Sequence, residues 1–207
     1  VTANGATRRW VADDARSLAT AAGVDDPWSL VNPVCFKEPV APWTAARRAR
    51  TAIRLDTVVS AFHSLSVRHR LLIVEGVGGL LVPLGPQATV ADLAGRLGLP
   101  LVLVARPGLG TLNHTLLTLA CARRLRLPVR GLIINYAQPP SRDPMARLAE
   151  RTNPDLLKRI ARVPLVGQLP FLPTLKGRWR VASGQAAALN GWVAHHLDPQ
   201  FLEELTD

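Results

Sequence analysis

The sequence contains little cysteine, little methionine and no long hydrophobic run. Its two cysteines, Cys35 and Cys121, are too few for a disulfide framework or a cysteine metal cluster, so we expect a cytoplasmic location. No apolar stretch approaches the roughly 20 residues that span a bilayer, and the polar N-terminus does not resemble a signal peptide, so we expect no membrane partner. Residue 1 is valine and the only methionine is Met145. We therefore expect that the natural product begins upstream of Val1.

Lysine is also scarce, although the net charge is +10. Nearly all basic residues are arginines, which are spread along the whole chain in short pairs such as Arg8–Arg9 and Arg123–Arg124. A net positive charge suits an anionic partner. No recognisable nucleic-acid-binding motif accompanies it, however, so we expect no nucleic-acid partner.

The remaining composition indicates a packed α/β protein. The 207 residues, 48% of them hydrophobic, fit one domain with a full core, and we expect residues 1–207 to form a single domain. Continuous apolar runs predict buried strands at 71–74 and 99–105, and two further strands are predicted at 129–135 and 164–170. Start and stop signals predict helices at 13–23, 43–50, 55–67 and 89–97, a long helix ending near 126, and a helix at 144–162 that Asn153–Pro154 could interrupt. This alternation predicts an open parallel sheet with helices on both faces.

The most informative segment is the run from Leu71 to Leu84. Its predicted strand ends on Glu75, which is followed by Gly76, Gly78 and Gly79. Ligands bind at the carboxyl ends of strands in open parallel sheets, and glycine lets the backbone approach them closely. A carboxylate there can bind Mg²⁺, which prefers hard oxygen ligands. The alternative is a tight strand-to-loop turn in which Glu75 caps a local group.

Several motifs together resemble the dethiobiotin synthetase family. The segment 74–84 resembles its second nucleotide-site motif, and Asn32–Pro33 with residues 39–42 resembles its Asn-Pro and Pro-x-x-Pro loop. Residues 110–118 resemble its Gly-x-x-Asn-His-x-x-Leu-Thr helix start, while 131–135 and 165–170 match its last two strands in order and spacing. The resemblance covers about residues 10–173.

The resemblance implies a P-loop NTPase-like α/β fold and a homodimer. Such enzymes use ATP, Mg²⁺ and CO₂ to close the ureido ring of dethiobiotin on 7,8-diaminononanoate. It also implies that Asp14 and Glu75 bind Mg²⁺ and that the backbone of Gly76, Val77 and Gly78 lies along the nucleotide. For Asp14 the alternative role is that of a helix N-cap.

The same resemblance assigns the adenine and substrate sites. Asn135 would hydrogen-bond the adenine edge, beside Tyr136, and the adenine pocket would be lined by Pro170, Phe171 and Leu172. Gly110 and Asn113 would bind the substrate, with Asn113 reaching its carboxylate end from the neighbouring subunit. The alternatives are a turn role for Asn135, a core role for Phe171 and helix capping by Asn113.

The sequence departs from the family pattern at its beginning. The family opens with a strand, a glycine-rich loop ending in Gly-Lys-Thr and a helix, and its next strand ends in Lys-Pro-Val. Here no lysine follows a glycine-rich turn, so we assign no catalytic lysine in this chain and expect it to be poorly stable and nearly inactive alone. In addition, no acidic residue lies between Phe171 and Asp198, and Trp43 stands where the family has histidine.

Two other functions remain open at this point. The chain could be an inactive paralogue that acts as a binding or scaffold partner. It could also be another P-loop-type ATPase or ligase, which the Asn-Pro loop and the Gly-x-x-Asn-His motif disfavour.

Overall fold

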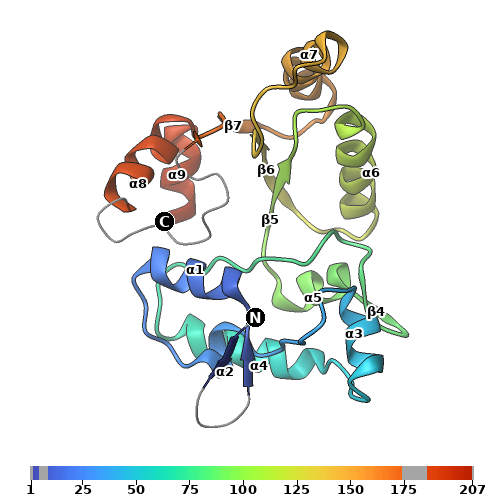
Figure 1. The fold of residues 1–207 in the computed structure, drawn as a ribbon, viewed down its shortest axis with the longest axis vertical. Helices are drawn as coiled ribbons and strands as arrows, with labels where there is room; N and C mark the ends of the chain where they lie inside the picture. Colours follow the sequence, from blue (N-terminus) through green and yellow to red (C-terminus); the bar gives the residue numbers. More distant parts are fainter. Residues whose placement is uncertain (1, 5–8, 174–185, 207) are drawn as a thin grey trace. The chain divides into compact units, whose positions relative to one another are not determined.

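The computed structural model describes residues 2–4, 9–173 and 186–206, which belong to two compact units divided between Gly98 and Leu99 (Figure 1). The first unit contains β1 (Thr2–Asn4), β2 (Arg9–Val11), α1 (Asp13–Ala22), α2 (Trp28–Val31), α3 (Pro42–Arg48), α4 (Leu55–Ser66), β3 (Pro83–Gly85), β4 (Ala88–Thr89) and α5 (Val90–Leu97). The second contains β5 (Leu101–Ala105), α6 (Thr111–Arg124), β6 (Val129–Asn135), α7 (Pro144–Ile160), β7 (Leu165–Leu169), α8 (Ala186–His195) and α9 (Pro199–Thr206). No helix of the described residues has the length and apolar character needed to cross a membrane.

The first unit is mainly helical, with two short antiparallel hairpins, β1–β2 and β3–β4. Its predicted helices are confirmed to within a few residues. Helix α1 ends at Gly23, whose φ of +67° is the left-handed conformation that glycine adopts readily. Helix α5 begins with a capping box, in which Thr89 and Asp92 each satisfy a backbone N–H of the other.

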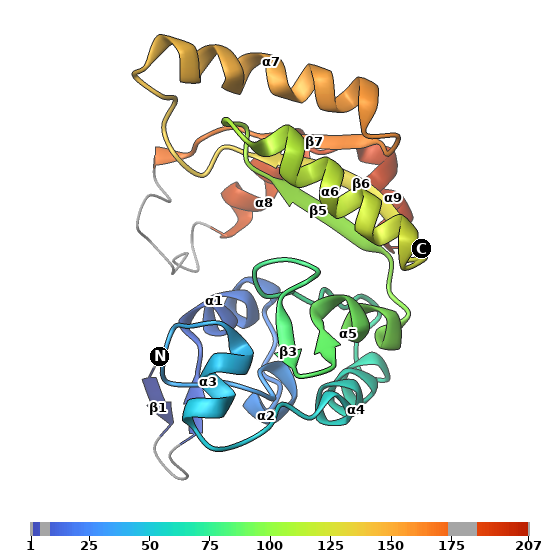
Figure 2. The same cartoon turned by 90° about the vertical axis from the view of Figure 1, so that its right-hand side faces the viewer.

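The second unit is built on a parallel sheet with the strand order β5-β6-β7. These strands match the runs predicted at 99–105, 129–135 and 164–170, and the α/β prediction is confirmed. Figure 1 shows α6 on one side of the strands and α8 and α9 on the other, and Figure 2 shows the same sheet from the side on which α6 lies.

Alternate residues of β6 serve the two faces of this sheet. Leu132 and Ile134 are fully buried in a core with Leu119 of α6 and Leu157 of α7. On the opposite face, a Cβ added at Gly131 would meet Val166 at 2.7 Å and the ring of Phe201 of α9 at 3.4 Å, so α9 packs directly on the backbone there. The prediction of helices on both faces is therefore confirmed for β6.

Two predictions about apolar runs are wrong. Residues 71–74 form no strand; Ile73 is 84% exposed, and Leu71 and Val74 are also exposed. No strand of the described chain pairs with this run, so its backbone lacks the hydrogen-bond ladder that would make it a strand. Strand β5 is covered on one face only, because Val102 and Val104 are exposed while their neighbours Leu103 and Ala105 pack against the core.

The candidate break in the last predicted helix does not occur, because α7 runs through Pro154. Proline has no N–H to donate to the carbonyl four residues earlier. That carbonyl belongs to Glu150, and it accepts a hydrogen bond from the Tyr136 hydroxyl at 3.2 Å instead. The helix therefore continues through Pro154, and the Glu150 carbonyl still has a hydrogen-bond donor.

The contact between β7 and the C-terminal helices predicts a position-specific effect of alanine at glycine. A Cβ at Gly167 would lie 2.9 Å from the carbonyl oxygen of His196 and would collide with Leu197, so Gly167→Ala should destabilise the protein by about 1–3 kcal/mol. The control is Gly191→Ala, where the added Cβ meets nothing within 4 Å and should stabilise helix α8 by up to about 1 kcal/mol. Chemical denaturation of both variants measures the difference, and equal unfolding midpoints would contradict the packing of this segment on β7.

Candidate functional site

The structure distributes the predicted site residues over both units. The metal and phosphate residues, Asp14 and Glu75 to Gly78, belong to the first unit. The predicted adenine and substrate residues belong to the second, namely Gly110, Asn113, Asn135, Tyr136, Pro170, Phe171 and Leu172.

Asp14 lies in the first turn of α1 with an exposed side chain. The N-cap of this helix is Ala12, so the alternative in which Asp14 is the N-cap is wrong. The Asp14 carboxylate accepts a hydrogen bond from the Ala15 amide at 2.8 Å. An acidic group in this first turn is favoured by the helix dipole and keeps an oxygen available for a ligand.

Glu75 lies close enough to Asp14 for the two carboxylates to interact. Partial burial, and then the negative charge of Asp14, raise the pKa of the Glu75 carboxyl above its ordinary value. Two like charges held together disfavour ionisation, and a divalent cation between them would remove this cost. The sequence placed these residues 61 positions apart, and the structure brings them together.

The donor set of this pair fits Mg²⁺. The described residues contain no cluster of three or more histidine, cysteine or acidic side chains that could enclose a metal. Mg²⁺ does not need such a cluster, because it commonly binds one or two carboxylates and fills its remaining positions with water and substrate phosphates. Two exposed carboxylates beside a glycine loop are therefore a suitable protein contribution.

The glycine loop after Glu75 has an open backbone. Gly76, Val77 and Gly78 are all exposed, and Gly78 has a φ of +74°, which favours glycine. The loop is also a tight turn, since the Gly79 amide donates to the Val77 carbonyl at 2.9 Å. The turn and nucleotide-binding interpretations of this loop are thus compatible.

In the second unit, the predicted adenine residues meet at the carboxyl edge of the sheet. Asn135 is the last residue of β6 and is the register partner of Leu169, the last residue of β7. The Tyr136 amide donates to the Leu169 carbonyl at 2.9 Å, which holds the two strand ends together. Pro170 is exposed, and Phe171 and Leu172 are half-buried directly after β7.

The Tyr136 hydroxyl is committed to α7. It donates to the Glu150 carbonyl, and burial, followed by the charges of Glu150 and Asp155, raises the pKa of the Tyr136 hydroxyl. A nucleotide at this edge could therefore contact the backbone or the ring of Tyr136, while the hydroxyl keeps its structural partner.

The predicted substrate residues lie at the start of α6. Gly110 is the N-cap, with a φ of +88°, and Asn113 is exposed in the first turn. Because the N-cap is Gly110 and the helix has no side-chain cap, the helix-capping alternative for Asn113 is wrong. Its amide is thus available at a helix N-terminus, where the helix dipole attracts anions.

Asn153 of α7 has a role that the sequence did not reveal. This residue is 8% exposed, and its side-chain amide donates to the carbonyls of Pro107 and Gly108 at 2.9 and 3.2 Å. These carbonyls belong to the loop between β5 and the start of α6. The available signal was an asparagine before a proline in a helical pattern, which we interpreted only as a break.

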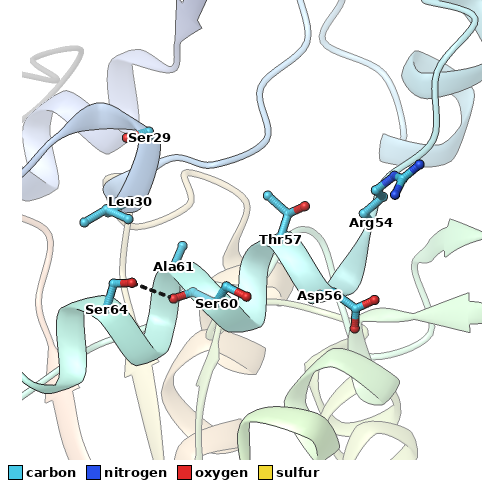
Figure 3. A pocket seen from close by; sticks show the side chains of 8 residues that line it. All are labelled: Ser29, Leu30, Arg54, Asp56, Thr57, Ser60, Ala61 and Ser64. Carbon is cyan, nitrogen blue, oxygen red and sulfur yellow. Dashed lines mark hydrogen bonds between the residues drawn. The ribbon is translucent and has the colours of Figure 1, made fainter.

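Neither of two surface hollows coincides with the predicted site. One of about 440 Å³, in the first unit, lies between α2 and α4, and half of its lining residues are serines or threonines, such as Ser29, Thr57 and Ser60 (Figure 3). The other, of about 370 Å³, lies in the second unit beside β7 and includes His195 and His196. No predicted site residue lines either hollow.

The comparison with known families agrees with the fold. The chain has an α/β fold of the P-loop NTPase type. A family model described as an AAA domain matches residues 6–178. Curated relatives named ATP-dependent dethiobiotin synthetase match with 38% identity in Thermodesulfovibrio yellowstonii, over 78% of this chain and 69% of the relative. The corresponding values are 44%, 69% and 58% in Bacillus licheniformis, and 40%, 84% and 76% in Anaeromyxobacter dehalogenans. The chain therefore belongs to the dethiobiotin synthetase family, and it spans less than two thirds of the Bacillus licheniformis relative.

The proximity of the two carboxylates predicts a change in titration. Asp14→Asn removes a negative charge beside Glu75, so the pKa of the Glu75 carboxyl should fall toward its ordinary value. Asp13→Asn is the matched control, because Asp13 lies in the same helical turn and does not contribute to the raised pKa of Glu75. Carbon-detected NMR titration of the Glu75 carboxyl measures both. An equal response to the two substitutions would show that the pair is not formed.

Proposed function

We propose that this protein is an ATP-dependent dethiobiotin synthetase, a ligase of biotin biosynthesis. The reaction joins 7,8-diaminononanoate and CO₂ into the ureido ring of dethiobiotin and converts ATP to ADP and phosphate. The single observation that best supports this proposal is the Asp14–Glu75 carboxylate pair beside an open glycine loop, in a chain of the dethiobiotin synthetase family.

In this proposal Asp14 and Glu75 hold Mg²⁺, and the backbone of Gly76, Val77 and Gly78 lies along the nucleotide phosphates. The bound Mg²⁺ would supply positive charge that offsets the negative charge of the phosphate oxygens. The open glycines allow the chain to approach these oxygens without interference from a side chain. Burial, and then the negative charge of Asp14, raise the pKa of Glu75, which supports the assignment because a bound cation would offset both costs of ionising this carboxyl.

We assign the adenine base to the carboxyl edge of β6 and β7. The Asn135 amide offers both a donor and an acceptor, as the adenine edge requires. Tyr136 would contribute its backbone or its ring, and Pro170, Phe171 and Leu172 would provide the apolar wall. The half-buried state of Phe171 and Leu172 supports this assignment, since a base needs an apolar surface that is not fully covered.

The substrate carboxylate is assigned to the start of α6, at Gly110 and Asn113. The exposed amide of Asn113 and the positive end of the helix dipole both favour an anionic group. In the proposed homodimer, Asn113 reaches the substrate of the neighbouring subunit. The exposed apolar side chains of Leu117 on α6 and of Met145 and Leu148 on α7 support an interface of this kind.

In this reaction the protein positions the reactants and stabilises the charge that develops on them. One substrate amine adds to CO₂ and loses a proton, which gives a carbamate. The carbamate oxygen takes the γ-phosphoryl group of ATP and ADP leaves. The second amine then attacks the carbonyl carbon, phosphate leaves, and the ring closes with loss of a proton.

We further propose that residues 1–207 act as a single domain located in the cytoplasm. The matched range 6–178 runs through both compact units, which supports one domain. The sequence has only two cysteines, and Cys121 is a free thiol, which supports a reducing compartment.

The activity is tested with isotopically labelled bicarbonate. The protein produced from its full coding sequence should incorporate the label into 7,8-diaminononanoate only when ATP is present. Glu75→Gln, which removes one metal-binding charge, should lower turnover by about a hundredfold or more. The control Glu204→Gln, on the exposed face of α9, should retain full activity. Normal turnover by the Glu75 variant would contradict its role as a metal ligand, and absence of incorporation by the unaltered protein would contradict the proposed function.

The adenine assignment is tested by nucleotide binding. Asn135→Ala should raise the dissociation constant of a non-hydrolysable ATP analogue about tenfold, because it removes hydrogen bonds to the base. Asn190→Ala, on the exposed surface of α8, is the control and should leave binding unchanged. Isothermal calorimetry measures both constants, and equal affinities would remove Asn135 from the adenine site.

A further inference from the structure

We propose that the Asn153–Pro154 step of α7 is a positioning device that fixes the carboxyl edge of the sheet. Asn153 binds the loop after β5, which leads to Gly110 and Asn113. Pro154 leaves the Glu150 carbonyl without a helical donor, so that this carbonyl accepts a hydrogen bond from Tyr136, the residue after β6. The link to substrate binding rests on the proposed function. The contacts themselves do not.

Asn153 is placed to hold two consecutive peptide groups. Its amide nitrogen carries two N–H donors, which match the two acceptors that it contacts, the carbonyls of Pro107 and Gly108. The Gly108 carbonyl also accepts the Thr111 amide at 3.2 Å, in the first residue of α6. One buried side chain thus fixes the loop and the start of the helix that carries Asn113.

Pro154 acts through the hydrogen bond that it cannot make. The Glu150 carbonyl, left without an N–H from residue 154, accepts the Tyr136 hydroxyl. Tyr136 follows directly after Asn135, and its own amide donates to the end of β7. Two neighbouring residues of α7 therefore control contacts to the ends of β5 and β6.

Packing alone does not explain these residue types. A buried amide costs free energy unless its hydrogen bonds are made, and a leucine of similar size would fill the same space. A proline inside a helix is also unfavourable relative to alanine. The hydrogen bonds of Asn153 and of the Glu150 carbonyl instead fix the geometry of the loop after β5 and of the end of β6.

The first test measures local opening by hydrogen exchange. Asn153→Asp keeps the shape and replaces two donors by acceptors, and Asn153→Leu removes all polar contacts. Both should raise the exchange rates of the Thr111 and His114 amides about tenfold or more, while the amides of Leu132 and Ile134 in the core of β6 change far less. Asn190→Asp is the control on α8, where the side chain is exposed, and should change neither group. A uniform rise across both groups, or no rise, would overturn the proposal for Asn153.

The second test is a double-mutant cycle between Tyr136→Phe and Pro154→Ala. In the natural background, Tyr136→Phe leaves the Glu150 carbonyl without a donor and should raise the unfolding equilibrium constant about fivefold to tenfold. Alanine in place of Pro154 supplies the missing N–H, so the same substitution in the Pro154→Ala background should have an effect of less than about twofold. Equal effects in the two backgrounds would overturn the proposal for Pro154.

A kinetic measurement connects the device to the substrate. Asn153→Leu should raise KM for the diamine about tenfold, with a smaller change in kcat and no change in the affinity for the ATP analogue. An equal loss for the diamine and for the nucleotide would overturn the positioning role. If the unaltered protein makes no dethiobiotin, the proposed function fails, and the exchange rates and the cycle still decide the present proposal.

Discussion

The parallel pairing of β6 with both of its neighbours is the constraint on which the second unit depends. Because β5, β6 and β7 run in the same direction, their carboxyl ends meet at one edge of the sheet. Residues that are far apart in sequence, such as Asn135 and Leu169, become register partners through this pairing. The helices are then placed by the apolar faces of the central strand, which Leu119 and Leu157 cover on one side and Phe201 on the other.

Polar contacts at this edge are as specific as the apolar contacts in the core. Asn153 donates to the loop after β5, and Tyr136 donates to α7. Each of these donors satisfies a backbone carbonyl outside the regular ladders, where an unpaired group would be costly. The same residues that stabilise the unit therefore determine the shape of the edge at which we place the nucleotide and the substrate.

The sequence predicted those elements whose signals are local. Strand β5 is a continuous apolar run and β6 and β7 are mainly apolar, and α1 and α5 have clear end signals at Gly23 and Thr89. The run at 71–74 has the same apolar pattern and forms no strand, because pairing depends on a neighbour that pattern does not reveal. The pairing of Asp14 with Glu75 is an expectation from family resemblance, and in the structure the negative charge of Asp14 contributes, after burial, to the raised pKa of the Glu75 carboxyl. The role of Asn153 depends on a contact across 46 positions of sequence, which no local pattern encodes.

The exposed run at 71–74 has a consequence for the behaviour of the protein in solution. Leu71, Ile73 and Val74 present a β-prone apolar segment, which can pair with the same segment of another molecule and start an aggregate. The net charge of +10 opposes such encounters through long-range repulsion. Salt screens that repulsion over a distance of about 10 Å at 0.1 M ionic strength. The colloidal stability of the chain should therefore decline as ionic strength rises, even where each molecule keeps its fold.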